Sequence, residues 1–132
     1  AHDTVDDARR ASQVVKELWP EQDLFVLPVT KADLELCFVG LPNAEFYYLP
    51  ELAVRDEKTV RSYVPQLDRL IDNALADGRV VLLTRQGQEA LLSDEAASRH
   101  PGAAVVAEHL FEAFTATAVR RQGLSGWTLA RR

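Results

Sequence analysis

Three basic side chains stand where predicted strands end. Lys31 follows the apolar run 23–29, Arg55 ends a brief strand, and Arg85 ends the apolar run 79–85. In an open α/β sheet, ligands bind outside the carboxyl ends of the strands. Lys31 beside a helix N-terminus, together with the two arginines, predicts a site for an anionic small molecule. The alternative is that all three side chains are solvated surface residues.

A second feature that points to binding is the run of three aromatic residues Phe46, Tyr47 and Tyr48. Three consecutive aromatic side chains cannot all face one core, so we expect at least one near the surface. There it would meet a partner, a membrane interface or a ligand, which makes Tyr47 and Tyr48 candidate binding residues. The alternative is that two are packed and one is exposed without a role.

Catalytic motifs are absent from the sequence. It contains no Gly-x-Gly-x-x-Gly, no phosphate-binding loop and no Gly-x-Ser-x-Gly. None of the three histidines, His2, His100 and His109, has a neighbour at metal-ligand spacing. Cys37 lies on the apolar face of a predicted helix, which is typical of a buried structural thiol. We therefore predict no catalytic residue, no metal ligand and no cofactor.

Carboxylate pairs are the exception that a sequence leaves open, because they can serve as general acid and base. Asp33 and Asp56 both follow predicted strands. Their positions are typical of a helix cap and a turn, so we interpret them as structural. Thr30 and Asp33 have the spacing of a capping box, with Asp in place of the usual Glu.

The elements that would position these residues alternate between helix and strand. We expect helices from Thr4 to Pro20, from Thr30 to Gly40, from 62–65 to Asp77-Gly78, and from Ser93 to His100. The runs 23–29 and 79–85 are almost unbroken apolar segments, which favours strands buried on both faces of a parallel sheet. We expect an irregular or helical turn over 43–50 and a brief strand over 52–55.

The last third of the chain allows two interpretations. The preferred one is a helix over 103–114 followed by an antiparallel hairpin, with strands over 115–121 and 127–131 and a loop over 123–126. The alternative is one helix over 103–121. The predicted fold class is thus α/β: a three-layer Rossmann-like sandwich with a mostly parallel sheet and a C-terminal antiparallel hairpin.

Composition bounds the class of protein. The 132 residues suit a single domain, and 47% hydrophobic with 27% charged residues is ordinary for a globular chain. The net charge of −5 argues against nucleic acid as a partner, since such binding needs a dense basic face. One Cys excludes an internal disulfide framework. Because the chain begins with Ala1 and contains no Met, we interpret it as a domain excised from a larger protein. The alternative is routine removal of the first residue alone.

Several segments together resemble one family. A helix leads to the buried strand 23–29, a Tyr-Tyr-Leu element follows over 46–49, then come Gly-Arg-Val-Val-Leu-Leu over 78–83 and Trp-Thr-Leu-Ala-Arg over 127–131. In this order they resemble the small extracytoplasmic domain that ends multi-spanning membrane glycosyltransferases using lipid-linked sugars. The resemblance covers most of the chain as a pattern. It carries no catalytic residue across, because in that family the catalytic carboxylates lie in loops of the membrane part.

Three hypotheses about function follow. The first is a non-catalytic module of a larger, membrane-bound glycosyltransferase, which assists acceptor or partner binding on the extracytoplasmic side. Its partner would be the membrane-spanning part of the parent protein. The second is a free-standing α/β protein that binds or acts on an anionic small molecule at Lys31, Arg55 and Arg85. The third is an intracellular regulatory domain that forms a homodimer. The last two would be cytoplasmic.

Overall fold

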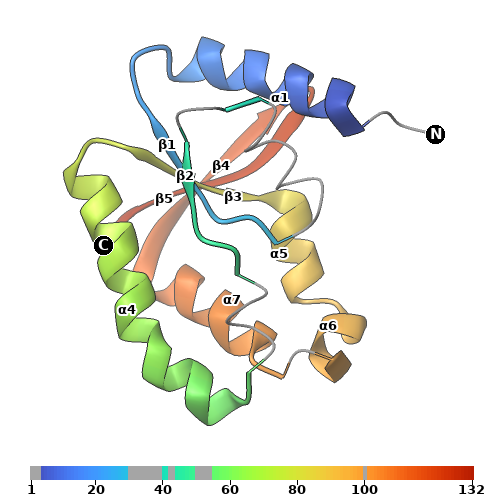
Figure 1. Cartoon of the computed structure of the whole chain (residues 1–132), viewed down its shortest axis with the longest axis vertical. Helices are drawn as coiled ribbons and strands as arrows, with labels where there is room; N and C mark the ends of the chain where they lie inside the picture. Colours follow the sequence, from blue (N-terminus) through green and yellow to red (C-terminus); the bar gives the residue numbers. More distant parts are fainter. Residues whose placement is uncertain (1–3, 30–39, 42–43, 50–54, 100) are drawn as a thin grey trace.

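The chain folds around an open five-stranded sheet with helices packed against it. The computed structural model describes residues 4–29, 40–41, 44–49, 55–99 and 101–132. The strands are β1 (Leu24–Val26), β2 (Glu45–Phe46), β3 (Val80–Thr84), β4 (Phe114–Arg121) and β5 (Leu124–Arg131). The helices are α1 (Thr4–Leu18), α4 (Glu57–Ala76), α5 (Arg85–Leu91), α6 (Asp94–Arg99) and α7 (Ala103–Ala113), and Figure 1 shows their arrangement.

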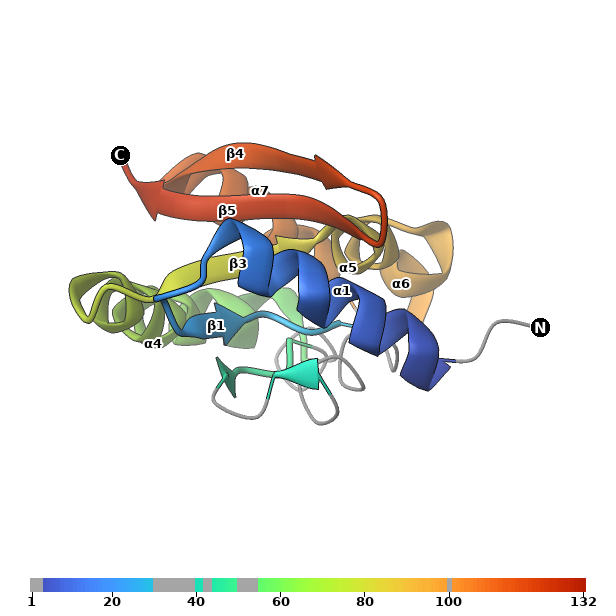
Figure 2. The same cartoon turned by 90° about the horizontal axis from the view of Figure 1, so that it is seen from above.

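The order of strands in the sheet is β2-β1-β3-β5-β4. β1 pairs in parallel with both β2 and β3, while β5 pairs antiparallel with β3 and with β4. β1 and β3 are therefore central and parallel, as their unbroken apolar sequences predict. Parallel pairing covers only half of the sheet, because the C-terminal hairpin supplies the other half. Figure 2 shows that hairpin along one edge and β2 along the other.

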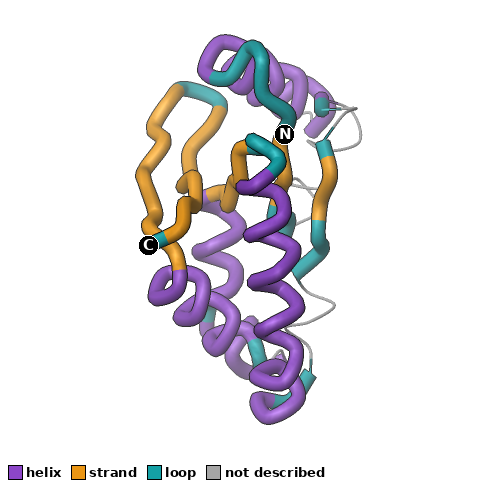
Figure 3. The backbone as a smooth tube through the Cα atoms, turned by 90° about the vertical axis from the view of Figure 1, so that its left-hand side faces the viewer, coloured by secondary structure: helices purple, strands orange, loops and turns teal. Residues whose placement is uncertain are grey.

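Helices lie on both faces of the sheet. Alternate residues of the strands point to opposite faces. Leu24, Val26, Val80 and Leu82 pack in the cluster that contains Ala11 and Val15 of α1. The alternate strand residues Phe25, Leu27, Val81 and Leu83 pack in a larger cluster with buried residues of α4 and α7. Figures 1 and 3 show α1 on one side of the sheet and α4 and α7 on the other.

Helix α4 begins earlier than predicted. Its N-cap is Asp56, whose carboxylate accepts a hydrogen bond from the backbone N–H of Thr59. The prediction of a start at 62–65 was wrong because it took Pro65 as an N-terminal signal. Pro65 instead lies inside the helix, on its exposed side. The predicted end is confirmed, since Asp77 is the C-cap and Gly78 has a φ of 76°.

The C-terminal hairpin is confirmed and is longer than predicted. Helix α7 ends at Ala113, and β4 starts at the next residue, which excludes a single helix over 103–121. Arg121 pairs with Leu124, so the turn holds only Gln122 and Gly123. Gly123 has a φ of 94°, a backbone conformation that glycine adopts without strain. The predicted loop over 123–126 was wrong, because β5 already begins at Leu124.

Other local predictions have mixed outcomes. The segment 43–50 contains the strand β2 rather than a helical turn. The expected helices at the N-terminus and after Ser93 are present as α1 and α6. The predicted helix from Thr30 to Gly40, with Lys31, Asp33 and Cys37, and most of the predicted strand 52–55 lie outside the described residues.

Candidate functional site

Two of the three basic residues predicted to form an anion site, Arg55 and Arg85, have separate partners. The guanidinium carbon of Arg55 lies 5.5 Å from the ring centroid of Tyr63, an arrangement typical of a cation–π contact. Arg85 is the first residue of α5, and its Nε lies 2.9 Å from Oε1 of Glu89 one turn later. Lys31, the third predicted member, is outside the described residues. The contacts thus place Arg55 against α4 and Arg85 against α5.

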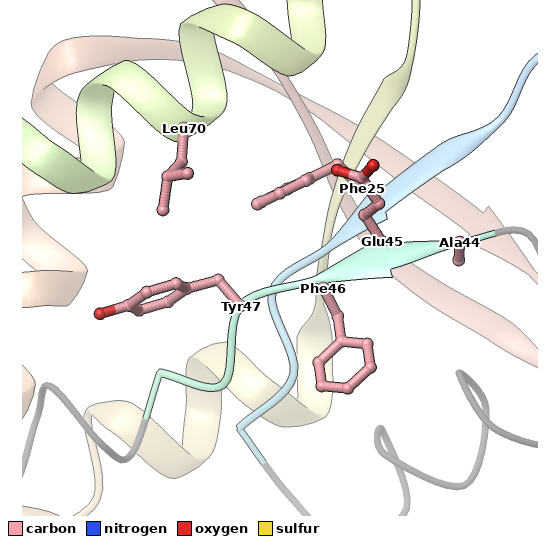
Figure 4. A pocket seen from close by; sticks show the side chains of 6 residues that line it. All are labelled: Phe25, Ala44, Glu45, Phe46, Tyr47 and Leu70. Atoms are coloured by element: carbon pink, nitrogen blue, oxygen red, sulfur yellow. The ribbon is translucent and has the colours of Figure 1, made fainter.

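The aromatic run starts on the edge strand β2, which ends at Phe46, and Tyr47 and Tyr48 follow the strand. Beside it lies a hollow of about 350 Å³, which we call the apolar hollow. Its lining comes from β1, β2, α4 and the residues beside β2: Phe25, Ala44, Glu45, Phe46, Tyr47 and Leu70. Figure 4 shows Phe25, Tyr47 and Leu70 around one space between α4 and the sheet. Phe46 points to the other side of the strand, where 38% of it is exposed.

Backbone pairing fixes the aromatic residues that border the apolar hollow. The Tyr47 N–H donates to the carbonyl of Val26 at 3.1 Å, and Leu49 donates to the carbonyl of Pro28. The Tyr47 side chain is half-buried and packs against the larger core cluster. Tyr48 is also half-buried but does not line the hollow. Of the two predicted tyrosines, Tyr47 therefore lines this hollow and Tyr48 does not.

A second hollow, of about 360 Å³, lies where β3 ends, and we call it the polar hollow. The register of the sheet brings its walls together: Thr84 pairs with Gly126, and Ser125 pairs with Arg120 on the neighbouring strand. Helix α5 starts directly after Thr84, whose Oγ1 accepts a hydrogen bond from the Gly87 N–H at 3.0 Å. The lining residues are Arg85, Gln88, Glu89, Ala118, Val119, Arg120, Ser125, Gly126 and Trp127.

The polar hollow contains one predicted residue, Arg85, and two that sequence reasoning missed, Arg120 and Trp127. The sequence indicates part of this lining. Residues two apart on a strand share a face, so Arg120 is expected on the same face of its strand as Ala118. Their approach to Arg85 depends on the pairing of β3 with β5, which local periodicity does not reveal. Arg120 also stands beside Arg121, which points to the opposite face of the strand.

Two carboxylates form contacts that are structural in character. Asp56 accepts hydrogen bonds of 2.8 Å from both the backbone N–H and the hydroxyl of Thr59. These bonds stabilise the ionised form and lower the pKa of Asp56 below its ordinary value. Asp68 on α4 lies 2.6 Å from Nε2 of His109 on α7, a partner that the sequence did not predict. Asp56 is thus a structural residue, as predicted, but it is the N-cap of α4 rather than part of a turn.

A third hollow, of about 430 Å³, is lined by Asp68, Asp72, Ala113, Phe114, Arg131 and Arg132. Its charged side chains have partners within it or close by. Nε of Arg131 lies 3.1 Å from Oδ1 of Asp72, and Arg132 donates to the carbonyl of Phe111. These bonds connect the end of the hairpin to α4 and α7.

Two other features are absent from the described residues. No three of their His, Cys, Asp or Glu side chains are grouped as a metal site would require. None of their helices combines the length and the apolar character of a membrane-spanning segment. Comparison of the chain with known protein families, with curated proteins and with solved structures found no match.

Proposed function

We propose that this chain is a non-catalytic binding module of a larger, membrane-bound glycosyltransferase of the lipid-linked-sugar type. In this proposal its fold is a three-layer Rossmann-like sandwich, and it lies on the extracytoplasmic side of the membrane. Its role is to hold an apolar part of the acceptor or of the membrane-spanning portion of the parent protein. The resemblance of the sequence to such domains supports the class of parent protein.

The observation that carries the binding role is the apolar hollow. Ligand sites are concave and mostly apolar, with few polar groups that fix orientation. Phe25, Tyr47 and Leu70 supply apolar walls from β1, from the residue after β2, and from α4. Glu45 is the charged residue of the lining, and its carboxylate lies 3.5 Å from the guanidinium of Arg79. An aliphatic or aromatic group fits this lining better than a charged one.

On the opposite side of β2 from the hollow, the side chain of Phe46 is exposed. It stands on an edge strand, where burial of its exposed apolar surface by a partner is favourable. Tyr47 adds a phenolic hydroxyl, which is a polar group at the end of an apolar ring. An apolar ring that carries a polar group is typical of the aromatic residues found at binding interfaces.

The test uses the full-length parent enzyme and two substitutions that change the volume of the apolar hollow in opposite directions. Tyr47→Ala enlarges the hollow, whereas Leu70→Trp fills it, and we expect both to reduce sugar transfer. Tyr63→Ala is the matched control, because Tyr63 is an exposed aromatic residue on α4 outside the hollow. Circular dichroism melting of each variant domain checks that it remains folded.

The result that contradicts the proposal is unchanged transfer in both folded variants, or an equal loss in the Tyr63→Ala control. Sedimentation of the isolated chain tests the alternative of a homodimer. If a dimer forms and Phe46→Ala abolishes it, the edge strand binds a second copy of the chain rather than the membrane part.

A further inference from the structure

The polar hollow has an excess of hydrogen-bond donors. Within the part of the chain that the structure describes, the side chains of Gln88, Arg120, Ser125 and Trp127 form no hydrogen bond or ion pair with protein atoms. The carboxylate in the lining, Glu89, already accepts from Arg85. Arginine and tryptophan side chains only donate, while serine and glutamine can do both. A ligand that complements this lining must therefore offer acceptors.

The charge of the lining indicates an anionic acceptor. Arg85 and Glu89 neutralise one another, which leaves the guanidinium of Arg120 as the uncompensated charge. A guanidinium forms its strongest hydrogen bonds with phosphate and carboxylate groups, because its fork of N–H groups matches their oxygen atoms. The whole chain has a net charge of −5, so its long-range field repels anions. Attraction of an anion to this place must arise locally, from Arg120 and its neighbours.

Trp127 gives the polar hollow a fixed apolar wall. Its ring contacts Phe111 of α7 edge to face, with centroids 5.5 Å apart and planes at 87°. Its backbone is held on both sides, because Trp127 pairs with Leu83 and with Ala118. The volume of about 360 Å³ is within the range of small-molecule sites, which starts near 300 Å³. There is room for a ring-sized body against the indole in addition to the anionic group.

We propose that the polar hollow binds a small molecule that carries a phosphate or carboxylate group on a ring-sized body. Arg120 is the main counter-ion of the anionic group, Gln88 and Ser125 orient it, and Trp127 packs against the body. The proposal goes beyond the binding role of the apolar hollow and uses none of its residues. Either proposal can fail while the other holds.

The test is isothermal titration calorimetry of the 132-residue chain at physiological ionic strength. Three ligands share one ring: glucose 1-phosphate carries a phosphate, glucuronate carries a carboxylate, and glucose carries neither. We expect saturable binding of at least one charged ligand and none of glucose. Tighter binding of the phosphate or of the carboxylate identifies the class of ligand.

The neighbouring arginines provide a matched pair of variants. Arg120→Gln removes the charge that faces the polar hollow, and the loss of a charge-assisted hydrogen bond lowers affinity about tenfold or more. Arg121→Gln removes the same charge from the opposite face of β4, and we expect its affinity to stay within about twofold of the original. Trp127→Leu should weaken binding of the ring compounds more than binding of inorganic phosphate.

Three results would overturn the proposal: equal losses in Arg120→Gln and Arg121→Gln, binding of glucose as tight as that of its charged analogues, or no binding up to about 10 mM ligand. The first would indicate general attraction to the basic end of the hairpin. Sugar transfer by the parent enzyme is not a readout in this experiment, so its outcome is separate from that of the apolar hollow.

Discussion

Asp68 on α4 and His109 on α7 face one another across the junction of these two helices, with Oδ1 and Nε2 2.6 Å apart. Both side chains are largely buried, with exposed fractions of 31% and 24%. The two helices share the larger core cluster through Leu67, Ile71, Val106 and Leu110. A polar bond at the rim of that apolar contact fixes one rotation of α7 relative to α4.

We expect the Asp68–His109 bond to contribute about 0.5–1.5 kcal/mol to the free energy of unfolding, between the values for exposed ion pairs and for charged hydrogen bonds. A double-mutant cycle of Asp68→Ala and His109→Ala, measured by urea denaturation, isolates this coupling. Asp94→Ala with His109→Ala is a suitable control cycle. A coupling energy indistinguishable from zero in both cycles contradicts a stabilising bond.

Asp56 should make the stability of the chain depend on pH in acid. Its pKa is lowered in the folded state by the hydrogen bonds from Thr59, so its stabilising effect is complete above its ordinary pKa of 3.8. The effect is lost as the pH falls through the lowered pKa. The difference in unfolding free energy between the original chain and Asp56→Ala should therefore narrow below pH 4. A difference that is constant from pH 7 to pH 2 would show that the charge of Asp56 has no part in capping.

Leucines at neighbouring positions of α4 should differ in their contribution to stability. Leu67 is only 1% exposed, so Leu67→Ala should lower the free energy of unfolding by about 2–5 kcal/mol. Leu70 is half-buried and borders the apolar hollow, so Leu70→Ala should cost less. Chemical denaturation of both variants gives the comparison. Equal losses would mean that Leu70 is as enclosed as the core.

Gly126 should not tolerate a side chain. A Cβ at this position would lie 2.3 Å from the carbonyl oxygen of Leu83 and 2.8 Å from Cα of Thr84. Because both are backbone atoms of β3, Gly126→Ala must push β5 away, at a cost of about 1–3 kcal/mol or more. Gly78→Ala is the control, because a Cβ there meets no atom within 4 Å and only the positive φ opposes it. Thermal melting of the two variants should rank Gly126→Ala as the less stable.

The sequence predicted the parts of the fold that local pattern determines. β1 and β3 are recognisable as apolar runs, and the hairpin from alternation on either side of Gly123. β2 was missed because two residues have no periodicity, and because its pairing with β1 is a tertiary contact. Pro65 misled the prediction of α4, since a proline is typical of the first helical turn, whereas Pro65 lies inside α4, where it removes one backbone hydrogen bond.

The candidate sites were less predictable than the fold. Tyr47 could be identified because three adjacent aromatic residues are unusual, but Phe25 and Leu70, which complete the apolar hollow, look like ordinary core residues. Arg85 could be identified from its place after a buried strand. Arg120 could not, because it reaches Arg85 only through the antiparallel pairing of β3 with β5, and that pairing is a long-range contact.

The two halves of the sheet differ in how far along the chain their pairing partners lie. The hairpin closes through a turn of two residues, and such hairpins form within about 1–10 μs. Pairing of Leu24 with Val80 requires closure of the long loop 27–79. This loop closure costs conformational entropy before any contact between β1 and β3 is formed. The hairpin is thus placed to form first during folding and to serve as the template on which β3, and then β1, is added. In pulsed hydrogen exchange during refolding, the amide of Val119, which faces β5, should gain protection before the amide of Leu82.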